Sequence, residues 1–428
     1  MSREMKDTSI SGLTQIPKTW NVVPLKMLFS FSKGLSITKS DLTDEGIKVI
    51  SYGQIHSKNC DGVHATNELI RFTANEFQSN NSLVKCGGVI FADTSEDLNG
   101  CGNAIYITDE VYGGYHTVVL NPKEAHDYRY LAYLFKTDAW RTELRKQLTE
   151  VKVFSITQFA LKNMHVILPS NEEMIQIADF LDSKCSSIDQ AIQKQKDIID
   201  KLAEFRQATI TQVVTHGVNS DDSIRRFQKN DYIWFDEIPQ NWKTYKLKYI
   251  TKLSKEKAIN KENYIGLENV ESKTGKFIGS QVEPDGDAII FHQNDVLFGK
   301  LRPYLSKSLL VEQEGCCSGE FLVITPKQIV PKYLLYITLS KAFVEHVNSS
   351  TYGAKMPRSN WEFVRNMIIP LPTESEQKEI ISYLDKKLAS IDNVIESTNT
   401  IIQKLEEYKK SLIYNAVTGK IDCRGEVK

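Results

Sequence analysis

Residues 169–217 read PSNEEMIQIADFLDSKCSSIDQAIQKQKDIIDKLAEFRQATITQVVTHG, and residues 372–419 repeat this pattern with different residues. Each stretch opens with a proline and a hydroxyl residue, Ser170 or Thr373, which stands three positions before Glu173 or Glu376. This spacing is that of a capping box, which marks the start of a helix. The recurrence therefore predicts two long helices in an internally duplicated chain.

Apolar residues in both stretches recur at alternating spacings of four and three, the narrow seam of a coiled coil. The predicted contacts between the helices are Leu181, Cys185, Ile188, Ile192, Ile199 and Leu202, and, 203 residues later, Leu384, Leu388, Ile391, Ile395, Ile402 and Leu405. Gln195 and Thr398 interrupt the seam at the same heptad position. A buried polar residue there penalises slipped registers, so we expect this pair to set the register. The alternative is that they mark an exposed end of the seam.

Two such helices in one chain would most simply pack on each other. At about 1.5 Å per residue, a helix over residues 188–214 is about 40 Å long. The sequence leaves open whether the helix continues back to Glu172 through Ser186 and Ser187.

The chain has 428 residues, of which 41% are hydrophobic and 25% charged, values that suit two soluble globular domains. It has neither an apolar run near the roughly 18 residues of a membrane span nor a signal-peptide core, so we expect a cytoplasmic protein. The seven cysteines form no C-x-x-C pair and are interpreted as reduced thiols. The net charge of -1 argues against a general nucleic-acid coat, so a nucleic-acid role would need local basic patches.

A second repeated phrase, Ile-Pro-x-x-Trp, occurs at residues 16–20 and 222 residues later at 238–242. Each half therefore opens with this phrase and closes with a long helix. The predicted organisation is a loose N-terminus at 1–15, globular domains at 16–169 and 238–372, helices at 170–217 and 373–420, a linker at 218–237 and a tail at 421–428. Because the repeat offset falls from 222 to 203, the first domain carries 19 extra residues of loop.

Short β-like runs separated by Gly, Asn and Asp turns fill the interior of each half. Predicted strands are 47–52, 88–91, 104–107 and 117–120 in the first half, and 264–267, 288–291, 295–298 and 321–324 in the second. A tyrosine-rich helix (128–133, 333–336) and a closing strand (164–168, 367–371) follow in each. The predicted fold class is α+β, with two similar globular domains joined by two long antiparallel helices in a pseudo-twofold repeat. The divergent interiors favour one scaffold with two different readout surfaces; drift after duplication is the alternative.

Catalytic motifs are not found in this sequence. It contains no phosphate-binding loop, dinucleotide fingerprint, nucleophile elbow, H-E-x-x-H motif or adenine-methyltransferase tetrapeptide. The acidic cluster at 284–287 is followed by no acidic-x-Lys element, and a turn is the favoured interpretation. We therefore predict a non-catalytic chain with no catalytic residues and no metal ligands.

Basic and aromatic loops are the candidates for contact with DNA, since arginine bonds guanine edges and lysine neutralises phosphate. In the second half they are residues 299–307 and 352–361, with candidates Lys300, Arg302, Tyr304, Lys307, Lys355 and Arg358. The matching regions of the first half, 92–98 and 151–156, are less basic, and the candidates in that half are Lys33, Lys39, Tyr52, Gln54, Tyr115, His116 and Lys152. Solvated charged loops are the alternative interpretation.

From Ile16 to about Asp422, this order of elements resembles the specificity subunit of type I restriction-modification enzymes. The resemblance implies two target-recognition domains, each reading half of an interrupted DNA sequence, and helices that set the spacing and dock two methyltransferase subunits. S-adenosylmethionine, ATP and Mg would be bound by those subunits and by a restriction (motor) subunit, and this chain would carry no cofactor or active site. The first domain departs from the pattern, because residues 151–156 lack the Gly-x-x-x-Pro of 353–357.

A rod of about 40 Å is close to the 34–36 Å turn of B-DNA, so we hypothesise that rod length sets the gap between two half-sites. One rival is a duplicated coiled-coil adaptor without DNA specificity. A second rival, a self-sufficient restriction enzyme, is disfavoured by the missing catalytic motifs.

Overall fold

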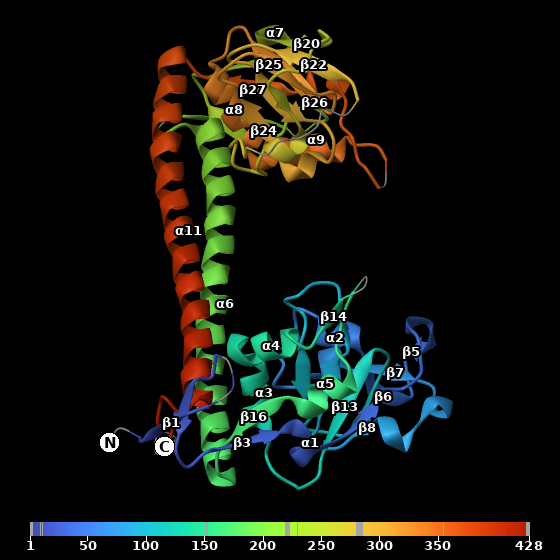
Figure 1. Cartoon of the computed structure of the whole chain (residues 1–428). Coiled ribbons are helices and arrows are strands. Elements are labelled where there is room, and N and C mark those ends of the chain that lie inside the picture. Colours follow the sequence, from blue (N-terminus) through green and yellow to red (C-terminus); the bar gives the residue numbers. More distant parts are fainter. Residues whose placement is uncertain are drawn as a thin grey trace. The chain divides into compact units, whose positions relative to one another are not determined.

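The computed structural model describes residues 3–8, 10, 12–150, 153–218, 223–228, 230–279, 286–353 and 355–424, with the backbone alone at 149 and 150. The chain divides into two compact units (Figure 1). Unit 1 comprises residues 1–193 and 401–428, and unit 2 comprises residues 194–400. The boundary crosses both long helices, so each unit holds one globular domain and part of each helix.

The two predicted helices are α6, Asn171–His216, and α11, Glu374–Val417. The helix α6 continues through Ser186 and Ser187, where the Ser187 hydroxyl donates to the Ser183 carbonyl at 2.9 Å. Such bonding back to the preceding turn lets serine sit within a helix. At about 1.5 Å per residue, the 46 residues of α6 make a helix of about 69 Å. This is longer than the length of about 40 Å that the sequence predicted for residues 188–214 alone.

The two helix starts differ in their capping. At the start of α11, Glu376 accepts from the Thr373 backbone at 2.9 Å while Thr373 accepts from the Glu376 backbone at 3.4 Å, a complete capping box. At the start of α6, Ser170 accepts from the Glu173 backbone at 3.3 Å, whereas the Glu173 carboxylate accepts from the indole of Trp20. The shared motif therefore gives reciprocal capping in the second copy and links helix to domain in the first.

The helices run antiparallel within each unit, as expected. In unit 1, Arg3 pairs with Glu173 at the start of α6 and with Asp422 just after α11. In unit 2, the Tyr333 hydroxyl is within hydrogen-bonding distance of the Val214 carbonyl near the end of α6 and the Pro370 carbonyl just before α11. Each unit thus brings the end of one helix beside the start of the other.

The predicted seam residues face inward to different degrees. Leu181, Cys185, Ile188, Ile192, Leu384, Leu388, Ile391, Thr398 and Ile402 are buried, and Gln195, Ile199, Leu202, Ile395 and Leu405 are half-buried. The Thr398 hydroxyl donates to the Val394 carbonyl of its own helix at 2.7 Å. This bond satisfies the buried hydroxyl, and a role of Thr398 and Gln195 in the register stays a prediction.

The globular domain of unit 1 contains two main sheets. The first is antiparallel, in the order β11 (Ala104–Tyr106), β9 (Val89–Ala92), β13 (Thr117–Pro122), β4 (Phe29–Lys33), and the second has the order β5 (Leu42–Thr43), β7 (Arg71–Thr73), β6 (Ile47–Ile50), β12 (Val111–Gly113), β8 (Leu83–Val84). The predicted strand at 47–52 is too long: it ends at Ile50, because Ser51 and Gln54 cap the short helix α2 (Tyr52–Ile55).

Smaller elements complete unit 1. A three-stranded sheet has the order β10 (Thr94–Ser95), β15 (Phe154–Ser155), β14 (Thr149–Glu150). Two strand pairs are β1 (Met5–Asp7) with β2 (Gln15–Pro17), and β3 (Asn21–Pro24) with β16 (His165–Leu168). The helices are α1 (Leu25–Leu28), α3 (Arg129–Lys136), α4 (Asp138–Arg145) and α5 (Gln158–Asn163). The predicted tyrosine-rich helix is α3, and the predicted closing strand is β16.

Unit 2 repeats this plan. Its sheets are β20 (Thr251–Ser254), β26 (Phe321–Pro326), β23 (Val296–Gly299), β24 (Ser308–Leu310), and β21 (Tyr264–Ile265), β25 (Gly315–Ser318), β22 (Ala288–Phe291). The other elements are β17 (Ile224–Arg226), β18 (Glu237–Pro239), β19 (Lys243–Lys246), β27 (Ile368–Leu371), α7 (Leu247–Ile250), α8 (Pro331–Leu339), α9 (Lys341–Ser349) and α10 (Trp361–Val364). The predicted strand at 264–267 is too long, since residues 267–269 form a 3-10 turn.

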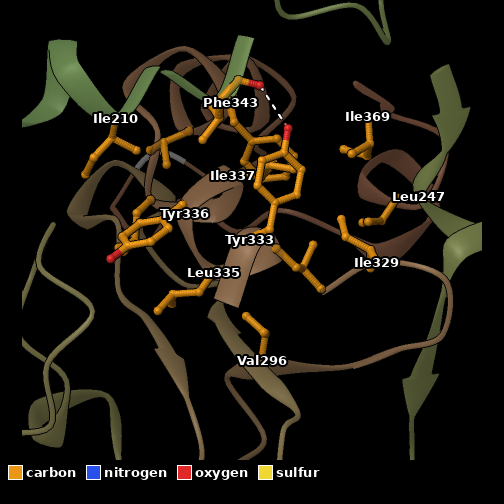
Figure 2. Close-up of a cluster of buried hydrophobic side chains, with 14 of the residues drawn as sticks. Ile210, Leu247, Val296, Ile329, Tyr333, Leu335, Tyr336, Ile337, Phe343 and Ile369 are labelled. Carbon is orange, nitrogen blue, oxygen red and sulfur yellow. Dashed lines mark hydrogen bonds between the residues drawn. The ribbon is translucent and has the colours of Figure 1, made fainter. Parts of the chain in front are cut away.

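The core of unit 2 includes the end of α6. Figure 2 shows Tyr333 of α8 among buried side chains that include Ile210 of α6, Val296 of β23 and Ile369 of β27. Tyr333 is fully buried, and burial raises the pKa of its phenol well above its ordinary value. The phenol therefore stays protonated and can donate to the carbonyls at its tip. The long helix and the globular domain share one core.

Each Ile-Pro-x-x-Trp phrase packs against the end of the helix from the other half of the sequence. Gly419 follows α11 with φ +70°, and a Cβ placed there would lie 2.4 Å from Cγ of Pro17 and 3.0 Å from the Trp20 ring. Gly217 follows α6 with φ +79°, and a Cβ there would lie 3.3 Å from the Trp242 ring. Glycine supplies the left-handed conformation that ends these helices. The end of each long helix therefore packs against the globular domain formed by the other half of the sequence.

In the described part of the chain, every helix is either too short or too polar to span a bilayer.

Candidate nucleic-acid interface

The two basic loops of unit 2, residues 299–307 and 352–361, lie side by side; we call them the basic loop pair. The Ser359 N–H donates to the Lys300 carbonyl at 3.0 Å, and the Arg302 N–H donates to the Pro357 carbonyl at 2.7 Å. Arg302 adopts a left-handed conformation with φ +50°, which costs a non-glycine residue energy. These backbone bonds hold the two loops as one surface, although Lys300 and Tyr352 are 52 positions apart in the sequence.

The candidate side chains of the basic loop pair differ in their availability. Arg302, Tyr304 and Lys355 are exposed, and Lys300 is half-buried. The Lys307 ammonium donates to the Leu267 carbonyl at 2.6 Å, so it supports the loop from within. Arg358 is engaged by Glu320 through two hydrogen bonds, a partner that sequence reasoning missed.

The matching regions of unit 1 are joined by equivalent contacts. The Ile156 N–H donates to the Asp93 carbonyl at 2.8 Å, as Ser359 does to Lys300, and the Asp93 N–H donates to the His116 carbonyl at 3.1 Å, as Lys300 does to Glu320. We call residues 92–98 and 153–156 the acidic loop pair. The sequence correctly matched these regions, and the structure shows that the same backbone carries different side chains in the two units.

The ionisable side chains at the two equivalent positions differ between the units. In unit 1 an acid, Asp93, lies 3.6 Å from the His116 ring. In unit 2 the base Lys300 replaces Asp93 in this arrangement, and the acid Glu320 replaces His116. Burial raises the pKa of Asp93, while His116 and Lys33 oppose this rise. The two domains therefore offer ligands different electrostatic patterns from one scaffold.

An aromatic cluster borders the acidic loop pair and contains three candidates. The Tyr52 ring lies 5.5 Å from the Tyr115 ring and 5.3 Å from the His116 ring, both in edge-to-face geometry. His116 is left-handed, with φ +53°, and its side chain is exposed. A strained exposed residue beside an aromatic cluster is typical of a binding site.

The remaining candidates of unit 1 have separate locations. Lys33 is exposed at the end of β4, opposite Val118 in the register. Gln54 accepts from the Ser51 backbone at 3.1 Å and so caps α2. Lys39 is exposed in a 3-10 turn, and no contact in the structure links it to the cluster within the described ranges. Lys152 lies outside the described residues, as does Asp285 of the acidic turn.

Cavities adjoin both loop pairs. In unit 2 a cavity of about 730 Å³ is lined by Lys300 of the basic loop pair, by Glu320, and by Lys255, Lys257 and Asp287. In unit 1 a cavity of about 510 Å³ lies beside Tyr52 and is lined by Glu96 and Asp97 of the acidic loop pair. Within the described ranges, no three His, Cys, Asp or Glu residues are grouped so that they could hold a metal ion.

A third polar cavity, of about 480 Å³, lies where the domain of unit 1 meets its helices. His64 lies in it between two acids, with its ring nitrogens 2.8 Å from Asp61 and 3.3 Å from Asp182 of α6. Hydrogen bonds to Asp182 and Asp61 raise the pKa of His64 to about 9. Lys136, Asp189 and Lys409 line the same cavity. His64 thus ties the domain to α6 as a cation.

Replacing His64 by glutamine is expected to destabilise unit 1 in a pH-dependent way. Because the folded pKa of about 9 exceeds the ordinary value of 6.5, the histidine contributes stability that is complete below about pH 6.5. This contribution is lost as the pH rises through 9. Thermal unfolding of the wild-type protein and of the His64→Gln variant should be measured from pH 5 to 10. The difference between their melting temperatures should shrink above pH 7; a constant difference would contradict the ion-pair explanation.

Comparison with known proteins identifies the family. A family model described as the type I restriction modification DNA specificity domain matches residues 17–210 and 239–407. The chain belongs to this family. Both specificity-domain matches begin at the proline of an Ile-Pro-x-x-Trp phrase and run into a long helix. The duplicated sequence pattern is therefore the family's domain occurring twice.

Individual relatives are distant. The type I restriction enzyme EcoDI specificity subunit of Escherichia coli is 25% identical over 284 residues, which cover 62% of this chain and 64% of that protein. The match thus spans less than two thirds of the relative. A chain solved in work on complex assembly and conformational transition of the type I R-M system has a TM-score of 0.70 at 14% identity, covering 95% of this chain and 99% of that one. The HsdS subunit from Thermoanaerobacter tengcongensis has a TM-score of 0.50 at 14% identity, covering 96% and 99%. These structures share the fold of this specificity-domain chain.

Proposed function

We propose that this chain is the DNA-recognition subunit of a type I restriction-modification complex, in which each globular domain reads one half of a bipartite target. The observation that carries the proposal is the pair of equivalent loop surfaces with different charge patterns. A duplicated scaffold that presents different side chains at the same backbone positions suits the reading of two different half-sites. The family membership supports the same role.

The chain would catalyse neither methylation nor cleavage. Two methyltransferase subunits would bind S-adenosylmethionine and methylate adenine, and restriction subunits would use ATP and Mg, all within the cytoplasm. With a net charge of -1, this chain has little overall attraction for DNA, so partners that clamp it onto the duplex suit its composition.

The long helices offer two matching surfaces for those partners. Ile198 and Phe205, seven residues apart on α6, are exposed in unit 2, and Ile401 and Tyr408 repeat them 203 residues later on α11 in unit 1. Residues seven apart lie on nearly the same side of a helix. We propose that each exposed apolar pair docks one methyltransferase subunit, and the duplication fits two copies of one partner. The proposed docking surface is thus partly apolar.

The experiment is to co-express the chain with methyltransferase subunits of the same complex and to sequence the host DNA for methylated adenines. Methylation at one bipartite motif is expected. Replacing Phe205 and Tyr408 by serine should abolish it without unfolding the chain, because the docking contacts are lost. If the partners bind the chain but no motif is methylated and no DNA is retained in gel shifts, the adaptor alternative stands and the proposal fails.

The same experiment tests whether helix length sets the gap between half-sites. One heptad inserted after Ile199 in α6 and another after Thr398 in α11 keeps the seam in phase. Each adds about 10 Å of helix, equal to about three base pairs of B-DNA. Methylation is expected at the same two half-sites with a longer gap between them. An unchanged gap would show that helix length does not set the spacing of the half-sites.

A further inference from the structure

Arg358 is held by an acid in a way that leaves one edge of its guanidinium free. Nε of Arg358 donates to Oε2 of Glu320 at 3.1 Å, and Nη2 donates to Oε1 at 3.0 Å. This side-on pairing uses one hydrogen of Nη2 and leaves its other hydrogen and both hydrogens of Nη1. In the part of the chain that the structure describes, Nη1 donates no hydrogen bond, and 36% of the side chain is exposed.

The backbone fixes the direction of this guanidinium. Arg358 and Tyr352 exchange two backbone hydrogen bonds, of 3.0 and 3.2 Å, and Arg358 also faces Leu301 across a bridge. The Glu320 carbonyl accepts from the Lys300 N–H at 2.9 Å, so the acid is attached to the same surface. Glu320 lies outside the basic loop pair, but it is bonded to that surface through both its backbone and its side chain. The free edge is oriented before any ligand binds.

The pairing determines what this arginine can recognise. Because Glu320 already compensates its charge, Arg358 has a weaker attraction for phosphate than the exposed Arg302 and Lys355 nearby. What remains is a directional fork of two parallel N–H donors. Such a fork matches the two acceptors O6 and N7 on the major-groove edge of guanine. Thymine and cytosine offer no such acceptor pair, and adenine presents an amino group in place of one acceptor.

We propose that Arg358 reads a guanine in the half-site bound by unit 2, and that Glu320 is the positioning residue that orients it. This inference rests on the proposed function and adds a base identity and a residue pair to it. Arg302 and Lys355, exposed and without a carboxylate partner among the described residues, contact the flanking phosphates.

The test uses the chain co-expressed with its methyltransferase subunits, with methylated motifs mapped in host DNA and binding measured on a library randomised at both half-sites. Arg358→Ala is expected to reduce the preference for guanine at one position by about 5- to 150-fold, the range for one bidentate pair. Glu320→Gln should weaken the same preference, because the fork loses its orientation. The half-site read by unit 1 should be unchanged. Lys355→Ala should weaken binding to all sequences alike and lower the salt slope by about one.

The matched control is Arg365→Ala. Arg365 is equally exposed, at 36%, and is also paired with an acid, Glu362, but it lies outside the basic loop pair. Its removal should leave the motif unchanged. If Arg358→Ala folds, as checked by thermal unfolding, and selects the wild-type motif, Arg358 is a structural brace and the inference is wrong. If the wild-type complex itself selects no motif, the proposed function fails first.

Discussion

Replacing Trp20 by alanine is expected to lower the free energy of unfolding of unit 1 by about 3–5 kcal/mol, the usual cost of removing a large buried aromatic side chain. Trp20 is fully buried, and its indole N–H donates to Glu173 at 2.8 Å. Its ring packs edge-on against Tyr130, with 6.2 Å between ring centroids, and against Gly419. One substitution therefore loosens the domain, the start of α6 and the end of α11 together.

Urea unfolding, with hydrogen exchange to locate the loss, measures this effect. Protection should fall in unit 1 and not in unit 2, and Trp242→Ala should show the converse, because Trp242 is the buried counterpart in unit 2. Trp361→Ala is the control, since this tryptophan is only half-buried and should cost less. If Trp20→Ala lowers the free energy of unfolding by less than about 1 kcal/mol, the Ile-Pro-x-x-Trp phrase does not anchor the helices.

Replacing Asp392 by alanine is expected to destabilise unit 2 by about 3 kcal/mol, the scale for breaking one side of a buried ion pair. Asp392 pairs with Arg206 of α6 and with Lys276, and the Arg206 side chain is only 7% exposed. Without Asp392 the guanidinium is left buried with its charge uncompensated. Exposure of Arg206 to water would require the helices to separate locally.

The repeat supplies a control for this substitution. Asp189 occupies the equivalent position in α6 and pairs with Lys409 in unit 1, where the Asp189 side chain is 55% exposed. Because exposed ion pairs contribute little, Asp189→Ala should cost less than about 1 kcal/mol. Thermal or urea unfolding of the two variants measures the contrast. Equal losses would show that burial of the arginine is not the cause.

Local patterns in the sequence predicted the parts of the structure that depend on neighbouring residues. The seam from Leu181 to Leu202 follows from helical periodicity, and the strands at 104–107 and 321–324 follow from short apolar runs between turns. Boundaries were less accurate where a side chain competes with the strand, as Gln54 does by capping α2. The correspondence of 92–98 with 299–307 was also visible, because both follow an equivalent strand.

The candidate site was only partly predictable. Tyr52, Tyr115 and His116 were named from residue type, and the structure brings their rings together. Lys307 and Gln54 were named on the same grounds, yet their polar groups bond within the fold. Charge and residue type suggest that a side chain can bind a ligand. Whether it is free to do so depends on partners that are distant in sequence.

The sequence by itself determined that this chain is a duplication with two long helices, because capping and heptad spacing act over a few residues and can be read locally. Only the tertiary structure decided which ends meet: Trp20 contacts Gly419, and Trp242 contacts Gly217. It alone paired Arg358 with Glu320, 38 residues away. Such contacts depend on how whole sheets and helices pack, and no local propensity encodes them.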